Sequence, residues 1–297
     1  MTHTSDCFGN HLGCWAIEPQ WMSGALSFLH GTGFAVGIAH QRAEQPQAAA
    51  SSDRRFIASG GIATIPIFGS MMKGQSKFGG TSTQETRRAI AAAVADKSID
   101  GIMLHIDSPG GHVAGTQELA DDIAAADKVK PIHAHIDDMG ASAAYWAGSQ
   151  ARSLTINEAG SAGSIGVFAV LYDSSGATEA EGVKVHVIST GEHKGAGIPG
   201  APITDDQLQE FQSQVDGIND LFMAAVKRGR GMGINQVRDL ADGRVLMSRQ
   251  AQAAGLVDGV MPFEGAVRKL KAAVRGERRS NTAAANIALA KIAGITG

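Results

Sequence analysis

Residues 101–111 read GIMLHIDSPGG, and this stretch decides the fold class. The apolar run at 101–107 predicts a strand that is buried on both faces. It leads directly into Ser108-Pro109-Gly110-Gly111, and a helix is expected from about 113 to 127. A buried strand, a glycine turn and a helix in this order are typical of an α/β fold with mostly parallel strands.

The pattern continues on both sides of this stretch. Further strands are expected at 62–68, 131–136, 154–156, 166–171 and 183–189. Pro66 places the first of these at a sheet edge or at a strand end. Capping boxes at Ser82 and Thr204 mark the starts of two helices, and the first is expected to end near residue 96. The second has about 25 residues and carries an apolar stripe, which is suited either to the core or to an interface. The second helix is expected to end at 227–229, and a short one covers 248–254, so the C-terminal part is helical.

The sequence divides into three parts. Residues 1–55 are expected to form an N-terminal arm and linker, residues 56–276 the folded domain, and residues 277–297 a tail that is helical or disordered. Hydrophobic residues make up 43%, charged residues 19%, and the net charge is −3. This composition is typical of a globular protein and offers no basic face for nucleic acid. No apolar run is long enough for a membrane anchor.

Cysteines and histidines give no sign of a metal site. The two cysteines, Cys7 and Cys14, are too few for a disulfide framework and lack a zinc pattern. His105, His133 and His135 alternate within strands, where packed structural histidines are common, although a Ser-His-Asp triad stays open. We expect neither a metal nor an organic cofactor.

Two motifs could carry chemistry. Amides at Gly110 and Gly111, near a helix N-terminus, are suited to hold an oxyanion or a phosphate, although a plain strand-to-helix turn fits as well. Ser142 stands at a second strand-to-helix turn, where a serine is either an exposed nucleophile or a helix cap. Lys194, in a glycine-flanked loop, is a base only if burial disfavours its charged form, and a surface lysine is the alternative.

Five motifs follow one another in an order that resembles the signal peptide peptidase A family of Ser–Lys peptidases, over about residues 56–275. They lie at 106–111, 141–145, 163–167, 191–194 and, as the fifth, 243–245 together with 253–258. The sequence WAIEP at 15–19 and the pair His193-Lys194 are similar to the phage branch of this family, the prohead proteases. The resemblance implies a ClpP/crotonase-like spiral of β-β-α units.

The resemblance also implies roles for individual residues. Ser142 matches the nucleophile, Lys194 the general base, and Ser164 a serine that orients the lysine. Gly110 and Gly111 match the oxyanion hole. One departure is that Ala143 and Ala144 stand where the family often has two glycines, which narrows the substrate groove without removing a catalytic group. The missing membrane anchor is a second departure, and it suits a phage enzyme.

The sequence therefore predicts a serine endopeptidase that forms homo-oligomers and cleaves phage scaffold or capsid proteins in the host cytoplasm, within the prohead. The alternatives are a crotonase-type acyl-CoA enzyme, a non-catalytic capsid assembly factor and a bacterial peptidase that degrades signal peptides. The cleavage site, the number of subunits, self-cleavage of the tail, and pairing of Ser142 with Lys194 across subunits stay open.

Overall fold

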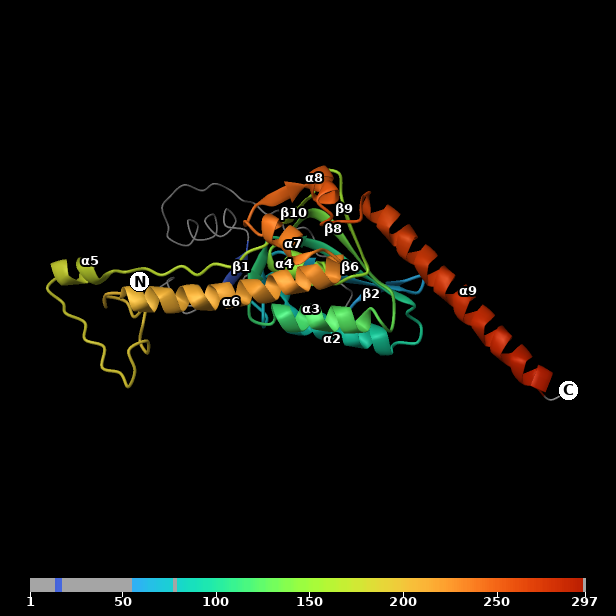
Figure 1. Cartoon of the computed structure of the whole chain (residues 1–297), viewed down its shortest axis with the longest axis horizontal. Coiled ribbons are helices and arrows are strands. Elements are labelled where there is room, and N and C mark those ends of the chain that lie inside the picture. The colour runs from blue at the N-terminus through green and yellow to red at the C-terminus, as the bar shows by residue number, and fades with distance from the viewer. Residues whose placement is uncertain (1–13, 18–54, 77–78, 296–297) are drawn as a thin grey trace.

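The computed structural model describes residues 14–17, 55–76 and 79–295, and two sheets organise them (Figure 1). The larger sheet has eight strands, in the order β11-β10-β8-β6-β3-β2, with β9 beside β8 and β12 beside β9. The smaller sheet has the order β1-β7-β4-β5. The strands are β1 (Trp15–Ile17), β2 (Ile57–Ser59), β3 (Ile62–Phe68), β4 (Met71–Met72), β5 (Thr81–Ser82), β6 (Gly101–Ser108), β7 (Gly110–His112), β8 (Ile132–Ala141), β9 (Ser153–Ile156), β10 (Ser161–Gly163), β11 (Val245–Met247) and β12 (Gly259–Val260).

The helices join these strands in a repeating order. They are α2 (Thr83–Ala95), α3 (Thr116–Ala126), α4 (Ala143–Gly148), α5 (Ser175–Ala180), α6 (Asp205–Arg230), α7 (Ile234–Leu240), α8 (Ser248–Ala253) and α9 (Phe263–Ile295). A long strand of the large sheet, short strands of the small sheet and a helix follow one another twice, as β3-β4-β5-α2 and β6-β7-α3. Strands β3, β6, β8, β9 and β10 run parallel. The predicted α/β fold with a mostly parallel sheet is confirmed.

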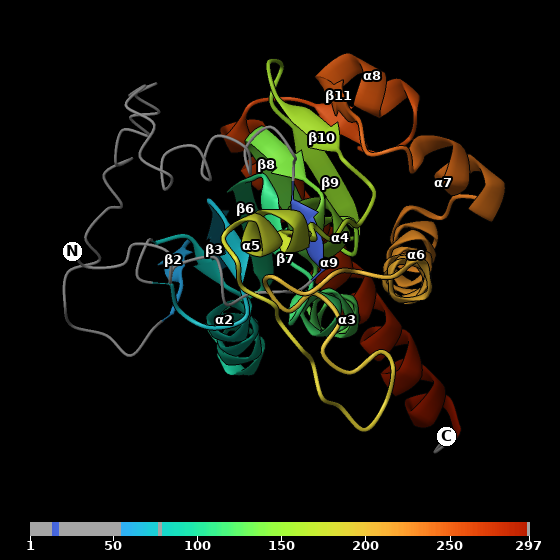
Figure 2. The ribbon, with the colours of Figure 1, turned by 90° about the vertical axis from the view of Figure 1, so that its left-hand side faces the viewer.

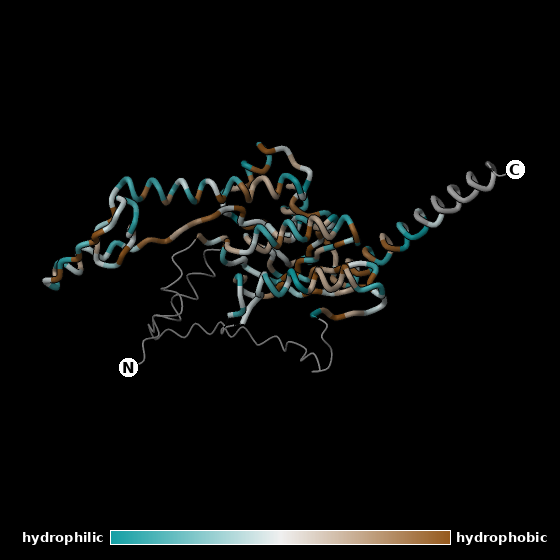
Figure 3. Tube along the Cα trace, turned by 90° about the horizontal axis from the view of Figure 1, so that it is seen from below, coloured by the Kyte–Doolittle hydropathy of each residue, from teal (hydrophilic) through white to brown (hydrophobic). Residues whose placement is uncertain are grey.

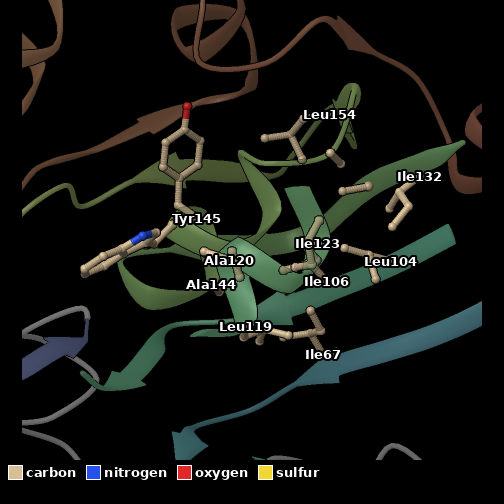
Figure 4. Close-up of a cluster of buried hydrophobic side chains, with 14 of the residues drawn as sticks. Ile67, Leu104, Ile106, Leu119, Ala120, Ile123, Ile132, Ala144, Tyr145 and Leu154 are labelled. Carbon is tan, nitrogen blue, oxygen red and sulfur yellow. The ribbon is translucent and has the colours of Figure 1, made fainter. Parts of the chain in front are cut away.

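The main core lies between the large sheet and helices α2, α3 and α4. Alternate residues of β6 and β8 point into it, among them Leu104, Ile106 and Ile136, each fully buried. Leu119 and Ile123 of α3 meet them from the helix side (Figure 4). The period of two in the strands and the amphipathic stripe in the helix thus produce one apolar layer.

The other face of the sheet carries histidines and is covered by the first turns of α9. Ala266 and Leu270 of this helix pack on Met103 of β6. His133 and His135 of β8 are buried on this face, as predicted for packed structural residues. Burial lowers the pKa of His133 to about 4, with Lys269 and Arg152 acting in the same direction. Burial also lowers the pKa of His135 to about 4, although Asp137 opposes the shift.

We expect the free energy of unfolding to fall as the pH drops from about 6.5 to about 4. In this window unfolded histidines bind protons while folded His133 and His135 stay neutral, so proton uptake favours the unfolded chain. Crossing the whole window costs on the order of 3 kcal/mol for each histidine. Urea titrations at several pH values measure the slope, and the double variant His133→Asn/His135→Gln should flatten it. An unchanged slope in that variant contradicts the assignment.

An ion pair with a buried guanidinium and a partly exposed carboxylate fastens α6 to the loop before β12. The Arg230 side chain is only 6% exposed and pairs with Asp258. Burial alone would raise the pKa of Asp258, but hydrogen bonds from Arg230 and from the Leu154 amide outweigh it and lower the pKa.

Replacing Asp258 with alanine should therefore reduce the free energy of unfolding by about 3 kcal/mol, because Arg230 is left buried without its partner carboxylate. A matched control is Glu158→Ala, which breaks the exposed pair of Glu158 with Arg249. Such a surface pair is worth less than about 1 kcal/mol. Urea denaturation measures the free energy of unfolding of both variants. Equal losses would show that the buried Arg230 does not make the pair with Asp258 more stabilising than an exposed pair.

An excursion, defined as residues 169–204, leaves the sheet and carries α5 at its far end (Figure 1). Helix α6 returns from it to the body, with the predicted capping box at Thr204. Between 166 and 221 the only described residue that is buried is Ala201. Apolar stretches run along the excursion beside the largely hydrophilic α6 (Figure 3). Within the described part of the chain, residues 205–217 of α6 thus bury no side chain, whereas Ile218 packs against the main core.

Several sequence expectations differ from the structure. Residues 166–171 and 183–189 are not strands, since only Phe168 makes an isolated bridge, to Trp15. Apolar, β-branched residues alone form no strand where no neighbouring strand offers hydrogen bonds. Helix α3 starts at Thr116 because β7 occupies the preceding residues, and α6 continues to Arg230, where Gly231 caps it in the left-handed conformation. The expected edge position of Pro66 is confirmed, because β3 extends beyond its short pairing with β2 and Pro66 pairs only with β6.

Most of the predicted N-terminal arm, with Cys7, lies outside the described residues. Its described part, β1, belongs to the body, since Ala16 is in the main core. At the other end α9 runs through residue 277 without a break and extends away from the sheet (Figure 1). The three-part division stays a prediction. None of the helices in the described part of the chain has the length and apolar character needed to cross a membrane.

Candidate active site

Ser142 stands at a sharp turn between β8 and α4. Its backbone has φ +54° and ψ −118°, a conformation that costs a residue with a side chain about 1–3 kcal/mol. The Ser142 amide donates to Gly163 O at 2.8 Å, and its carbonyl accepts from Trp146 N at 2.8 Å. Its hydroxyl makes no capping bond, so Ser142 is not an ordinary helix cap. The turn is held by the backbone and leaves the hydroxyl unused.

Ser164 lies beside this turn at the end of the neighbouring strand. Strand β10 runs parallel to β8, with Gly163 opposite Ala141, so both strands end at the same edge. Ser164 has φ +50°, is buried, and donates its amide to Arg244 O at 2.8 Å. Among the described residues, Ser142 and Ser164 are the two non-glycine residues with positive φ. Backbone strain of this kind gathers at functional sites, and here it marks two adjacent serines.

The two predicted oxyanion glycines adjoin the Ser142 turn. Gly110 has φ +94°, and a Cβ added to it would lie 2.8 Å from Ala143 N and 2.9 Å from Ala141 O. At Gly111 the added Cβ would lie 1.9 Å from Met71 O. Neither position has room for a side chain, because the backbone approaches so closely. The structure therefore brings Gly110, Ser142 and Ser164 together.

The glycine loop differs from expectation in one respect. Gly110 and Gly111 belong to strand β7, and the Gly110 amide donates to Ser108 Oγ at 3.1 Å. Ser108 is buried and donates its own hydroxyl to Gly69 O at 2.6 Å. The sequence reasoning gave Ser108 no role, although it lies in the same motif. Its hydroxyl ties the glycine loop to Gly69, the residue that follows β3.

Lys194 is not brought to Ser142 within one chain. It is exposed, and it lies in a turn of the excursion in which its amide donates to Gly191 O at 3.1 Å. The hollow that it lines is formed only by residues between 185 and 207. Ser142 Oγ is buried and has no hydrogen-bond partner among the described residues. Ser142, the candidate nucleophile, thus lies in the site, whereas Lys194, the candidate base, lies on the excursion, outside the site.

The helix that follows Ser142 is firmly anchored. Trp146 stacks on Phe222 of α6 with ring centroids 4.6 Å apart. The Tyr145 hydroxyl donates to Leu256 O at 2.9 Å, and burial raises the pKa of Tyr145. Burial also raises the pKa of the Cys14 thiol, which disfavours it as a nucleophile. Within the described ranges no group of three or more His, Cys, Asp or Glu is arranged to hold a metal ion.

Comparison with known proteins identifies the family. Residues 124–276 match the model of peptidase family S49, and this match covers more than half of the chain. The chain belongs to family S49. The matched part of this S49 chain contains Ser142, Ser164 and Lys194, whereas Gly110 and Gly111 precede it. Membership in a peptidase family favours a peptidase over the acyl-CoA enzyme that the fold class had left open.

The S49 chain is similar to two phage proteins. It is 30% identical to the capsid assembly protease C of Escherichia phage lambda, over 74% of this chain and 51% of that protein. It is 27% identical to the head-tail preconnector protein GP5 of Enterobacteria phage P21, over 75% and 45%. The chain thus spans about half the length of these relatives. A solved structure of a ClpP1 variant from Listeria monocytogenes matches with TM-score 0.43 and 13% identity, over 68% of this chain and 93% of that one.

Proposed function

We propose that this S49 chain is a serine endopeptidase with Ser142 as nucleophile and Lys194 as general base. The observation that carries the proposal is the Ser142 hydroxyl, which is held on a strained strand-to-helix turn without a hydrogen-bond partner among the described residues. Ser164 and Gly110 adjoin the same turn. In this proposal Ser164 orients the lysine, and the glycine pair binds the oxyanion.

Lys194 is proposed to come from a second copy of the chain. The excursion that carries it exposes large apolar side chains, including Tyr172 at 72% and Ile188 at 98%. Leu208, on the apolar stripe of α6, is exposed as well. Apolar surface of this kind is typical of protein interfaces. Docking the excursion on a neighbouring copy would bury the amine, and burial favours the neutral form that a base needs.

The proposed reaction begins with proton transfer. Neutral Lys194 takes the proton of Ser142 Oγ as the oxygen attacks a peptide carbonyl and forms a tetrahedral intermediate. Main-chain amides at Gly110 and Gly111 stabilise the oxyanion, a contribution worth about 3–4 kcal/mol per donor in comparable sites. The Gly110 amide donates to Ser108 Oγ in the structure, so it has to release that bond to reach the oxyanion. The lysine then protonates the leaving amine. Lys194, neutral again, takes a proton from a water molecule that attacks the acyl-enzyme, and it returns this proton to Ser142 Oγ as the acyl bond breaks.

The proposed substrates are phage scaffold and capsid proteins, cleaved by a homo-oligomer inside the prohead in the host cytoplasm. The support is the similarity to a protein named capsid assembly protease, over about three-quarters of this chain. The reaction as proposed uses side chains and main-chain amides alone.

Co-expression with a capsid protein and a scaffolding protein tests this function. Wild type is compared with Ser142→Ala, and mass spectrometry of the products identifies each cleaved bond. We expect discrete new termini in the scaffolding protein, the capsid protein or the tail of the chain itself, all missing with Ser142→Ala. Capsid assembly that proceeds equally with both forms, without Ser142-dependent termini, would favour a non-catalytic assembly factor.

A further inference from the structure

Strand β1 is inserted between two neighbours that are far from it in sequence. On one side it pairs antiparallel with β7, with Ala16 opposite Gly111 and Ile17 opposite Gly110. On the other side Trp15 N donates to Phe168 O at 2.8 Å, and Phe168 N donates to Trp15 O at 3.0 Å. Three residues therefore fill a slot that is lined with main-chain donors and acceptors on both edges. Figure 2 shows β1 in blue at the centre, beside β7 and α4.

This slot adjoins the nucleophile. A Cβ added to Gly110 would lie 2.4 Å from Ala16 O and 2.8 Å from Ala143 N. One glycine thus contacts β1 on one side and the residue after Ser142 on the other. A peptide whose carbonyl reaches both Ser142 and the glycine amides must lie along β7, because an oxyanion has to be about 3 Å from its donors. Strand β1 already occupies that place, and Ser142 is fully buried.

We propose that Trp15–Ile17 is a built-in occupant of the peptide-binding slot. The substrate main chain binds as a strand between β7 and Phe168, and β1 has to leave first. This inference rests on the proposed peptidase function and adds to it the substrate's conformation and a means of autoinhibition. Strand addition to an open sheet edge is a common mode of peptide recognition, in which main-chain hydrogen bonds give affinity and side-chain pockets give specificity.

The side chains of β1 define the substrate class. Trp15 and Ile17 are 6% and 2% exposed and pack against Met72 and Phe168 on one face. The Trp15 ring also meets the edge of His112, with centroids 5.2 Å apart. Ala16 points to the opposite face and is fully buried in the main core. The slot therefore accepts an extended segment in which a small residue lies between two large apolar ones.

Tethering makes β1 a strong competitor. A segment of the same chain has an effective concentration on the order of mM, so a free peptide of equal intrinsic affinity displaces it poorly at μM concentration. A long substrate that contacts the surface elsewhere competes better. Intact assembled proteins are therefore favoured over short peptides.

A disulfide lock tests the proposal. Trp15 and His112 are opposite each other, and because the Trp15 amide and carbonyl bond to Phe168, they form a non-hydrogen-bonded pair with close Cβ atoms. The lock is Trp15→Cys/His112→Cys in a Cys7→Ser/Cys14→Ser background. Oxidation should reduce cleavage of an added peptide by at least about tenfold, and dithiothreitol should restore it, since only the reduced strand can leave. Equal rates in the two redox states overturn the proposal.

A binding measurement keeps this test separate from catalysis. The same lock with Ser142→Ala is titrated with a peptide that copies residues 13–20, with serine for Cys14, at concentrations up to several mM, because the peptide competes with a tethered strand. Isothermal titration calorimetry should show binding to the reduced form and at least about tenfold weaker binding to the oxidised form. A control peptide with leucine for Ala16 should bind weakly to both forms. Equal binding of the peptide to the reduced and oxidised forms overturns the proposal. Binding to the reduced form alone, together with a lack of any Ser142-dependent cleavage, contradicts only the peptidase function.

Discussion

Peptide cleavage is expected to fall at least about 10³-fold when Ser142 is replaced by alanine, while the fold stays intact. The loss is large because the hydroxyl forms the covalent intermediate, and the remaining groups act only through binding and oxyanion stabilisation. Rates of cleavage of a quenched fluorescent protein substrate measure the effect.

Stability should move in the opposite direction. The Ser142 hydroxyl is buried and has no hydrogen-bond partner among the described residues, so removing it relieves an unsatisfied polar group. Alanine and serine bear the same backbone strain at φ +54°. We therefore expect the free energy of unfolding of Ser142→Ala to be unchanged or slightly higher than that of the wild type. An unsatisfied, strained serine of this kind reduces stability, as is expected of a residue with a functional role.

Ser149→Ala, at the opposite end of α4, is the matched control. Ser149 Oγ donates to Trp146 O at 2.8 Å and accepts from Gln150 Nε2 at 2.8 Å. Its loss should cost about 1–2 kcal/mol of stability and leave cleavage within a few-fold of wild type. If the two variants instead lose activity in proportion to lost stability, Ser142 has only a structural role.

The sequence predicts well those elements whose partners are local or follow a strong period. Strands 62–68 and 101–107, and the capped helices after Ser82 and Thr204, lie where the periodicity places them. Strand β7 and its pairing with β1 could not be predicted, because the two segments are about 95 residues apart and each has only three residues. The expected strand at 183–189 is part of an excursion without a neighbouring strand.

The candidate site divides in the same way. Ser142 and Ser164 end adjacent parallel strands, so motif order together with a parallel sheet is enough to bring them together. The contact of Gly110 with the Ser142 turn depends on the second sheet, which local patterns do not reveal. Lys194 lies on a segment in which Ala201 is the one buried residue among those that the structure describes. No pattern within one sequence indicates whether such a segment completes the site of its own chain or that of a neighbouring copy.

Subunit mixing should therefore restore activity to two inactive variants. Ser142→Ala keeps the lysine, and Lys194→Ala keeps the serine, so each homo-oligomer lacks one group at every site. In an oligomer assembled at random from equal amounts of the two, about one quarter of the sites combine an intact serine with an intact lysine of the neighbour, provided that the interface repeats around a closed ring. Co-expression with two different affinity tags, followed by tandem purification, isolates the mixed oligomers for rate measurements.

The result separates two arrangements that a single chain leaves undecided. If Lys194 docks on a neighbour, the purified mixed oligomers recover from about a half of the wild-type rate, for a dimer, down to about a quarter, for a large ring, while either variant co-expressed with the double variant Ser142→Ala/Lys194→Ala stays inactive. If the excursion folds back on its own chain instead, each site has lost one group regardless of its neighbour, and mixing recovers nothing. Recovery also requires that the exposed apolar side chains of the excursion, such as Ile188, become buried on assembly. Ile188→Asp should then abolish complementation together with oligomer formation, because an unpaired charge would be buried at the interface.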